Sequence, residues 1–192
     1  MDSGSPKDAK NEFVIVDLET TGLSAERHRI TEIAAVKVRS GVIVDKFESL
    51  VNPGVPIPRH ITRITGIDDD TVKDAPPVKD VLASFLRFAG DSTIVAHNAN
   101  FDMGFLRYNA AKDLKMSVLN PSLCTKELSK QMVPEMSSRA LSSLCAFFGI
   151  VNENAHRAMG DVKATFQIFN LLQNRMKENS EETASQHVEL PN

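Results

Sequence analysis

Two carboxylates separated by one residue end the first hydrophobic stretch of the sequence. Asp17 and Glu19 follow the apolar run 13–16 and precede a Thr-Thr-Gly turn at 20–22. Residues two apart on a strand point to the same face of the sheet, so we expect these side chains next to each other. Like charges at a buried strand end repel unless a proton or a cation lies between them. Because carboxylate oxygens suit hard divalent ions, the pair predicts a Mg²⁺ or Mn²⁺ site.

Further acidic residues stand where helices are expected to begin. Asp102 follows a short apolar strand and falls in the first turn of the next helix, and Asp161 falls in the first turn of the last helix. Alone, each would most simply be a cap or a partner of the helix dipole. Together with Asp17 and Glu19 they give four carboxylates, whose charge matches that of two divalent ions.

Four carboxylates around two metal ions are suited to hydrolysing a phosphodiester. Two ions about 3.5–4 Å apart clamp a phosphate for in-line attack, one activating the water and the other stabilising the leaving 3′ oxygen. His156 lies five residues before Asp161. Histidine changes its charge near neutral pH, so His156 is suited to accept the proton of the attacking water.

The elements that must position these groups follow from the hydrophobic pattern. After the first strand, the runs 29–38 and 42–50 flank a Ser-Gly turn and predict an antiparallel hairpin. Further short strands are expected at 93–96 and 122–125, and helices at 77–90, from Asn98 or Asn100 onward, at 140–149 and at 157–177. Strands first, then strands alternating with helices, indicate a three-layer α/β domain with a mixed sheet.

Domain boundaries follow from composition. Residues 12–177 are expected to form one domain, between a disordered lead-in at 1–11 and a polar, disordered tail at 178–192. The acidic triplet 68–70 is expected to supply helix caps and solvated charge. The cysteines, Cys124 and Cys145, are expected to be reduced thiols.

Bulk properties exclude several classes of protein. The 192 residues are 42% apolar and 24% charged, as in an ordinary globular domain. A net charge of −3 argues against extended duplex binding, which depends on many phosphate contacts, but not against gripping one strand end. The start lacks an apolar signal region, and no run approaches the roughly 20 apolar residues that span a bilayer. The protein is therefore expected to be cytoplasmic, with no membrane partner.

Three motifs give the sequence a family resemblance. They are Asp-Leu-Glu-Thr-Thr-Gly at 17–22, His-Asn-Ala-Asn-Phe-Asp at 97–102 and His-Arg-Ala-Met-Gly-Asp at 156–161. In this order and spacing they resemble the DEDDh exonucleases, which are DnaQ-like proteins with a ribonuclease H-like fold. The His-x4-Asp spacing of the third motif separates this group from a sister group with Tyr-x3-Asp.

The resemblance implies a fold, an activity and roles for residues. The implied fold has a five-stranded sheet in which the second strand is antiparallel, and the implied activity trims single strands from the 3′ end to nucleoside 5′-monophosphates. Asp17, Glu19, Asp102 and Asp161 would be the ligands of two Mg²⁺ or Mn²⁺ ions, and His156 the general base. The implied substrate contacts are Thr20, Thr21, Leu23, Thr65, Asn98 and Phe101. His97 would either touch the substrate or support the strand end.

Within that family, the sequence looks most similar to the proofreading exonucleases of bacterial DNA polymerase III. The stretches 29–36 and 65–67 carry this likeness, whereas Cys124 stands where those members often have Asp. Single-stranded DNA is therefore the favoured substrate. Short RNA is an alternative substrate, and a non-catalytic module that binds nucleic-acid ends is a more distant reading. A free-standing enzyme and a domain of a polymerase both remain open.

Overall fold

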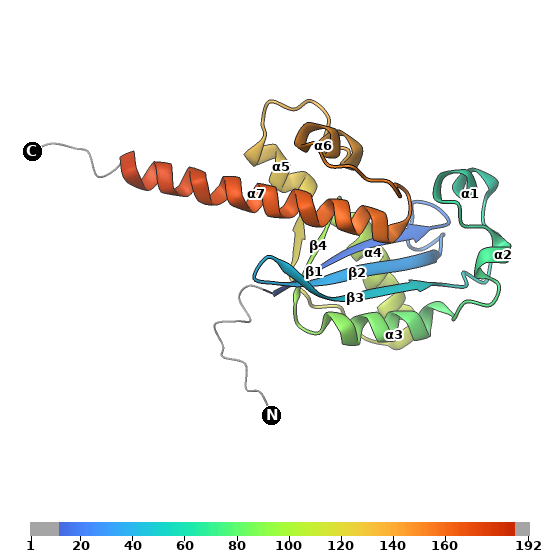
Figure 1. Ribbon diagram of the computed structural model, residues 1–192. Coiled ribbons are helices and arrows are strands. Elements are labelled where there is room, and N and C mark those ends of the chain that lie inside the picture. The colour runs from blue at the N-terminus through green and yellow to red at the C-terminus, as the bar shows by residue number, and fades with distance from the viewer. Residues whose placement is uncertain (1–11, 187–192) are drawn as a thin grey trace, which may run out of the picture.

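The computed structural model describes residues 12–186, which form a central sheet covered by helices on both faces (Figure 1). Its strand order is β3-β2-β1-β4-β5. β2 is antiparallel to β1 and to β3, whereas β1, β4 and β5 run parallel. The strands are β1 (Glu12–Thr20), β2 (Ile30–Arg39), β3 (Val42–Leu50), β4 (Thr93–Ala96) and β5 (Ser122–Cys124). This confirms the predicted three-layer α/β fold with a mixed five-stranded sheet.

The hairpin between β2 and β3 forms where the sequence predicts it. Ser40 and Gly41 both have positive φ, at 51° and 80°, which suits the tight turns that join antiparallel strands. The helices are α1 (Arg59–Thr65), α2 (Asp69–Val72), α3 (Val78–Ala89), α4 (Ala99–Asn109), its π-helical continuation η2 (Ala110–Leu114), α5 (Thr125–Met132), α6 (Leu141–Phe148) and α7 (Ala158–Gln186).

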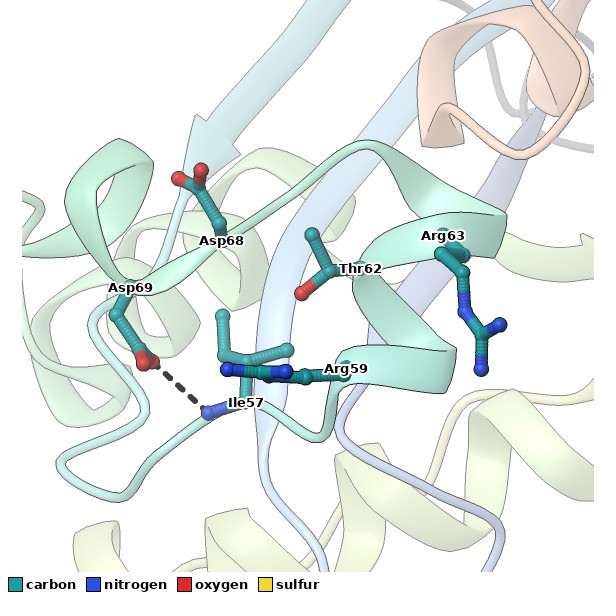
Figure 2. A pocket seen from close by; sticks show the side chains of 6 residues that line it. All are labelled: Ile57, Arg59, Thr62, Arg63, Asp68 and Asp69. Carbon is teal, nitrogen blue, oxygen red and sulfur yellow. Dashed lines mark hydrogen bonds between the residues drawn. The ribbon is translucent and has the colours of Figure 1, made fainter.

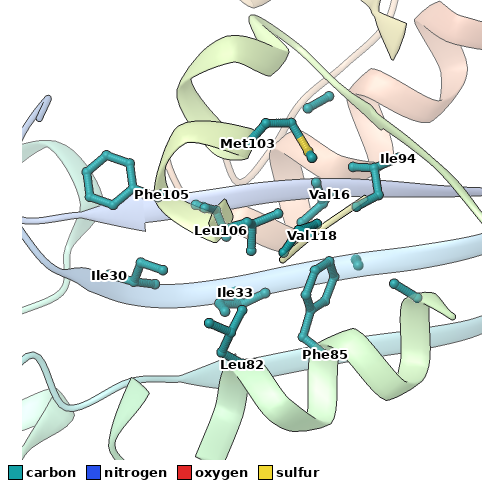
Figure 3. Close-up of a cluster of buried hydrophobic side chains, with 14 of the residues drawn as sticks. Val16, Ile30, Ile33, Leu82, Phe85, Ile94, Met103, Phe105, Leu106 and Val118 are labelled. Carbon is teal, nitrogen blue, oxygen red and sulfur yellow. The ribbon is translucent and has the colours of Figure 1, made fainter. Parts of the chain in front are cut away.

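Alternation along β1 gives each face of the sheet its own core. Val14 and Val16 pack on one face with side chains from α3 and α4, among them Phe85 and Leu106 (Figure 3). Ile15 points to the opposite face, where it packs with residues of α7. α5 and α6 pack in turn against α7 around a further cluster that includes Leu144 and Ile168. By the same alternation, Asp17 and Glu19 lie on the α7 face of the sheet.

The structure differs from the sequence-based expectation at α7. The polar tail was expected to lose its structure from Glu178, but the helix continues to Gln186. The apolar stripe ends before that point, yet residues 178–186 contain neither Gly nor Pro and include three Glu and an Ala, which favour helix. The expected lead-in at 1–11 and the end of the tail lie outside the described residues.

The acidic triplet 68–70 and the two cysteines have the surroundings that the sequence predicts. Asp68 caps α2, its carboxylate accepting a hydrogen bond from the amide of Thr71. Both Cys124 and Cys145 are free thiols. Over the described residues, none of the helices combines the length and the apolar character that crossing a membrane requires.

Candidate active site

The two strand carboxylates lie at the carboxyl end of β1, next to the start of α7. Asp17 pairs with Ala34 of β2 and Glu19 with Glu32, and the register shifts immediately after Glu19. That irregularity ends the regular pairing and begins the turn at 20–22. The strand therefore presents both carboxylates at the edge of the core, on the face that α7 covers.

Asp161 completes a compact group of three carboxylates. Carboxylate oxygens of Asp17, Glu19 and Asp161 all lie within 4.8 Å of one another. Asp161 is fixed by two hydrogen bonds: Oδ1 accepts from Asn152 Nδ2 at 2.6 Å and Oδ2 from the amide of His156 at 3.1 Å. The arrangement has the donors and spacing of a divalent-cation site.

Asp102 lies beside this group, although it is not one of the three. It is 2% exposed in the first turn of α4, which begins after the left-handed residue Asn98 (φ 67°). Its charge raises the pKa of both Asp17 and Glu19. The structure thus brings all four predicted carboxylates into one electrostatic unit.

Burial raises the pKa of every acid in this unit, and repulsion from the other acids adds to the shift at Asp17 and Glu19. Desolvation is the largest cause in each case. The pKa of Glu19 rises to about 8, with additional repulsion from Asp161, Glu32 and Asp102 and partial relief from Arg157. The pKa of Asp102 also rises to about 8, opposed by backbone hydrogen bonds from its own amide and that of Leu18. The pKa of Asp17 is raised well above 3.8. The metal-free site therefore favours protons or cations.

These shifts predict how the stability of the metal-free protein depends on pH. Folding raises the pKa of Glu19 from 4.5, and that of Asp102 from 3.8, to about 8. The folded state therefore binds more protons than the unfolded state between those pH values. The stability that these two bound protons contribute is fully present below about pH 4 and is lost as the pH rises through about 8. We expect the melting temperature in EDTA to fall across this window.

A variant isolates the effect of the two acids. The double substitution Glu19→Gln and Asp102→Asn should flatten the dependence of melting temperature on pH in EDTA, because neither amide titrates. A wild-type melting temperature that stays level or rises between about pH 5 and pH 8.5 would contradict the raised pKa values.

Glu32 is a site residue that the sequence analysis did not single out. It is 1% exposed on β2, directly opposite Glu19. Its carboxylate accepts hydrogen bonds from Nε and Nη2 of Arg157, at 3.2 and 2.7 Å, and from the amide of Ala158 at 3.0 Å. The available signal was an acid inside the otherwise largely apolar stretch 30–38, on a strand paired on both sides.

His156 lies in the loop that leads into α7, with an exposed side chain. Its backbone has φ 64°, a left-handed conformation that is uncommon for residues with a side chain. The loop also approaches the helix so closely that a Cβ on Gly160 would clash with the carbonyl of Asn154. The imidazole is therefore presented to solvent beside Asp161 by a tightly held backbone.

The turn after β1 has two buried threonines and an exposed leucine. Thr20 Oγ1 donates to the carbonyl of Gly22 at 2.7 Å, and Thr21 Oγ1 accepts from the amide of Arg29 at 3.0 Å. Leu23 is 86% exposed. The threonine hydroxyls thus stabilise the turn, and the leucine presents an apolar surface to solvent.

The other predicted contact residues have different surroundings. Thr65 is buried, and its hydroxyl binds backbone atoms of Ile61 and Ile67. Phe101 is half-buried against Phe105, with ring centroids 5.1 Å apart, and Asn98 is exposed. For His97, Nδ1 lies 3.0 Å from Thr125 Oγ1 and Nε2 lies 3.0 Å from the carbonyl oxygen of Arg139. Both ring nitrogens of His97 thus have partners within the protein.

A separate surface pocket of about 700 Å³ lies between α1 and α2 (Figure 2). The amide of Ile57 donates to Asp69 Oδ1 at 2.8 Å beside it. Its walls combine two arginines with two aspartates, so charge does not favour an anion over a cation there. The lining residues are Ile57, Arg59, Thr62, Arg63, Asp68 and Asp69.

Comparison with known proteins identifies the family. Residues 14–169 match the family model RNase_T, described as Exonuclease. The chain belongs to this exonuclease family. It is 45% identical over 169 residues to the PolC-type DNA polymerase III of Caldanaerobacter subterraneus subsp. tengcongensis, and 44% identical over 179 residues to that of Bacillus subtilis. These matches cover 88% and 93% of this chain, which spans only 12% of each polymerase.

Solved exonuclease structures have the same fold. Exonuclease X in complex with 5′ overhanging duplex DNA matches with a TM-score of 0.65 and 26% identity, over 84% of this chain and 91% of that chain. The E. coli ExoI–ssDNA complex matches with a TM-score of 0.77 over 91% of this chain and 43% of that chain. Its 19% identity supports the fold alone. The predicted resemblance to DnaQ-like exonucleases is confirmed.

Proposed function

We propose that this exonuclease domain is metal-dependent and removes nucleotides from the 3′ end of single-stranded DNA, releasing nucleoside 5′-monophosphates. The observation that carries the proposal is the group of Asp17, Glu19 and Asp161 oxygens within 4.8 Å, beside buried Asp102. Family membership supplies the reaction class, and the carboxylates supply a means of performing it.

The residues of this site fit divalent metal ions. All four donors are carboxylates, the ligand type that Mg²⁺ and Mn²⁺ prefer. Their raised pKa values reflect burial, with added repulsion at Asp17 and Glu19, and a bound cation would offset both effects. We assign Asp17, Glu19, Asp102 and Asp161 as the ligands of two ions. When bound, such ions supply positive charge to the phosphate undergoing cleavage and to the incoming water.

The protein's own groups would handle the proton and the strand end. His156 takes the proton of the attacking water at an imidazole nitrogen, which its exposed position beside Asp161 allows. Leu23 contacts the terminal base, because an exposed aliphatic side chain can act as an apolar wedge against the face of a base. Thr20 and Thr21 shape the turn that the terminal nucleotide meets, and Thr65, Asn98 and Phe101 line its approach.

The preference for DNA rests on the relatives. The PolC-type relatives are DNA polymerases, and the solved exonuclease X structure contains DNA. The net charge of −3 is compatible with contact at one strand end. We further propose that the domain proofreads for a bacterial DNA polymerase in the cytoplasm, as the likeness to PolC-type chains suggests.

A time course on strands labelled separately at the 3′ and 5′ ends tests the proposed function. Matched DNA and RNA oligomers would be incubated with Mg²⁺, with Mn²⁺ and with excess EDTA. We expect early loss of the 3′ label, a ladder of shortening 5′-labelled strands, faster cleavage of DNA, and no reaction in EDTA. Full activity in EDTA would overturn the metal assignment. Faster cleavage of RNA than of DNA would make RNA the substrate, and binding without cleavage would favour a non-catalytic module.

A further inference from the structure

Glu32 has an environment that neither the four proposed ligands nor His156 explains. It is a carboxylate with only 1% of its side chain exposed, on the β2 strand that pairs with β1. A buried carboxylate is costly unless it is paired and hydrogen-bonded. Oε1 accepts from Arg157 Nη2, and Oε2 accepts from Arg157 Nε and from the Ala158 amide. The Glu32 carboxylate thus binds the segment that leads into α7.

That segment carries His156 immediately before Arg157. His156 has the left-handed φ of 64°, and its amide donates to Asp161 Oδ2 at 3.1 Å. The loop is therefore held on one side by Asp161 and on the other by Glu32. An unusual backbone conformation persists only where surrounding contacts determine it, and these are two such contacts.

We propose that Glu32 and Arg157 form a positioning clamp that fixes His156 beside the carboxylate group. The inference rests on the proposed function, because it takes His156 as the general base. Neither clamp residue touches the substrate in this role. A fork of two parallel hydrogen bonds fixes direction as well as distance, which a single contact does not. Small errors in the placement of a catalytic group are costly to the rate.

The chain offers a matched control at the opposite end of the same strand pair. Arg39 binds Glu12 through Nε at 3.1 Å and Nη2 at 2.7 Å, and the two residues are opposite each other in the β1–β2 register. This ion pair has the same two residue types, although both Arg39 nitrogens bind the single oxygen Oε2 of Glu12. It is remote from His156 because Glu12 begins β1, whereas Glu19 lies near its end.

The main test is Glu32→Gln, which keeps the shape of the side chain and removes its charge. The amide group then presents a donor to the Arg157 fork. We expect kcat on a DNA oligomer to fall by about 10–100-fold, with KM changed by less than about threefold. Glu12→Gln should leave both constants within about twofold. Glu32→Asp retains the charge with a shorter reach and should recover part of kcat.

A double-variant comparison separates positioning from general destabilisation. In a His156→Ala background, Glu32→Gln should cause no further loss of kcat, because the group that it positions is absent. A further loss of about 10-fold or more there would overturn the proposal. An equal fall in kcat for Glu12→Gln would also overturn it.

A readout without metal keeps the inference separate from the proposed function. Hydrogen exchange at the amides of His156 and Ala158 in EDTA should become about tenfold faster in Glu32→Gln, and should stay unchanged in Glu12→Gln. Unchanged exchange at both amides would overturn the clamp. If His156→Ala alone retains full activity, the base assignment fails, and the exchange data still decide whether the clamp holds the loop.

Discussion

Asp17→Asn is expected to abolish exonuclease activity and, at the same time, to stabilise the metal-free protein. Asp17 belongs to the group of three carboxylates within 4.8 Å, and its pKa is raised by burial and then by repulsion from Asp102, Asp161 and Glu19. Removing one ligand forfeits several kcal/mol of charge stabilisation in the transition state. A loss of about 4 kcal/mol corresponds to a rate about 10³-fold lower.

The stabilising half of this prediction follows from the same charges. At neutral pH in EDTA, Asp17 must either take up a proton on folding or bring a charge into a buried site beside Glu19, Asp102 and Asp161, whereas asparagine has nearly the same shape and does neither. We expect a higher melting temperature in EDTA and a smaller rise on adding Mg²⁺ or Mn²⁺ than in the wild type, because metal binds the folded state less tightly.

Measuring both quantities on one preparation makes the test decisive. Activity on a 5′-labelled DNA strand and melting temperature with and without metal would be compared with Glu12→Gln, a carboxylate change far along the same strand. An inactive variant with a lower metal-free melting temperature would indicate a damaged fold. Wild-type activity in Asp17→Asn would contradict its role as a ligand.

Local pattern was sufficient to predict one part of the site and insufficient for another. The period of two along β1 places Asp17 and Glu19 on one face, opposite Val16, as the structure has them. The position of Asp161 next to these two carboxylates depends on how α7 packs across the sheet. No local pattern contains that information, so its placement depended on the motif at 156–161.

Glu32 and the end of α7 show what local pattern misses. Glu32 reads as one polar position on a strand, but β2 lies between β1 and β3 and under α7, so the side chain is buried. Its partner Arg157 is 125 residues away in sequence. At α7, the helix continues beyond the last residues of its apolar stripe, because the residues that follow favour helix and include neither Gly nor Pro.

His156→Ala is expected to lower kcat by about 10²–10⁴-fold while leaving metal and strand binding nearly intact. The side chain is exposed, and the contact that His156 makes with Asp161 comes from its backbone amide, which alanine retains. The substitution therefore removes the proton acceptor without removing a hydrogen bond of the loop.

The choice of replacement decides what the result means. Histidine enters the left-handed region more readily than alanine does, whereas glycine adopts the φ of 64° without strain, so His156→Gly distinguishes backbone effects from loss of the imidazole. Both variants should be equally slow if proton transfer is lost, and added imidazole should restore part of the rate. Unchanged kcat in both would assign the proton to another acceptor. A Mn²⁺ affinity that fell in step with kcat would make His156 a support of Asp161 instead of a base.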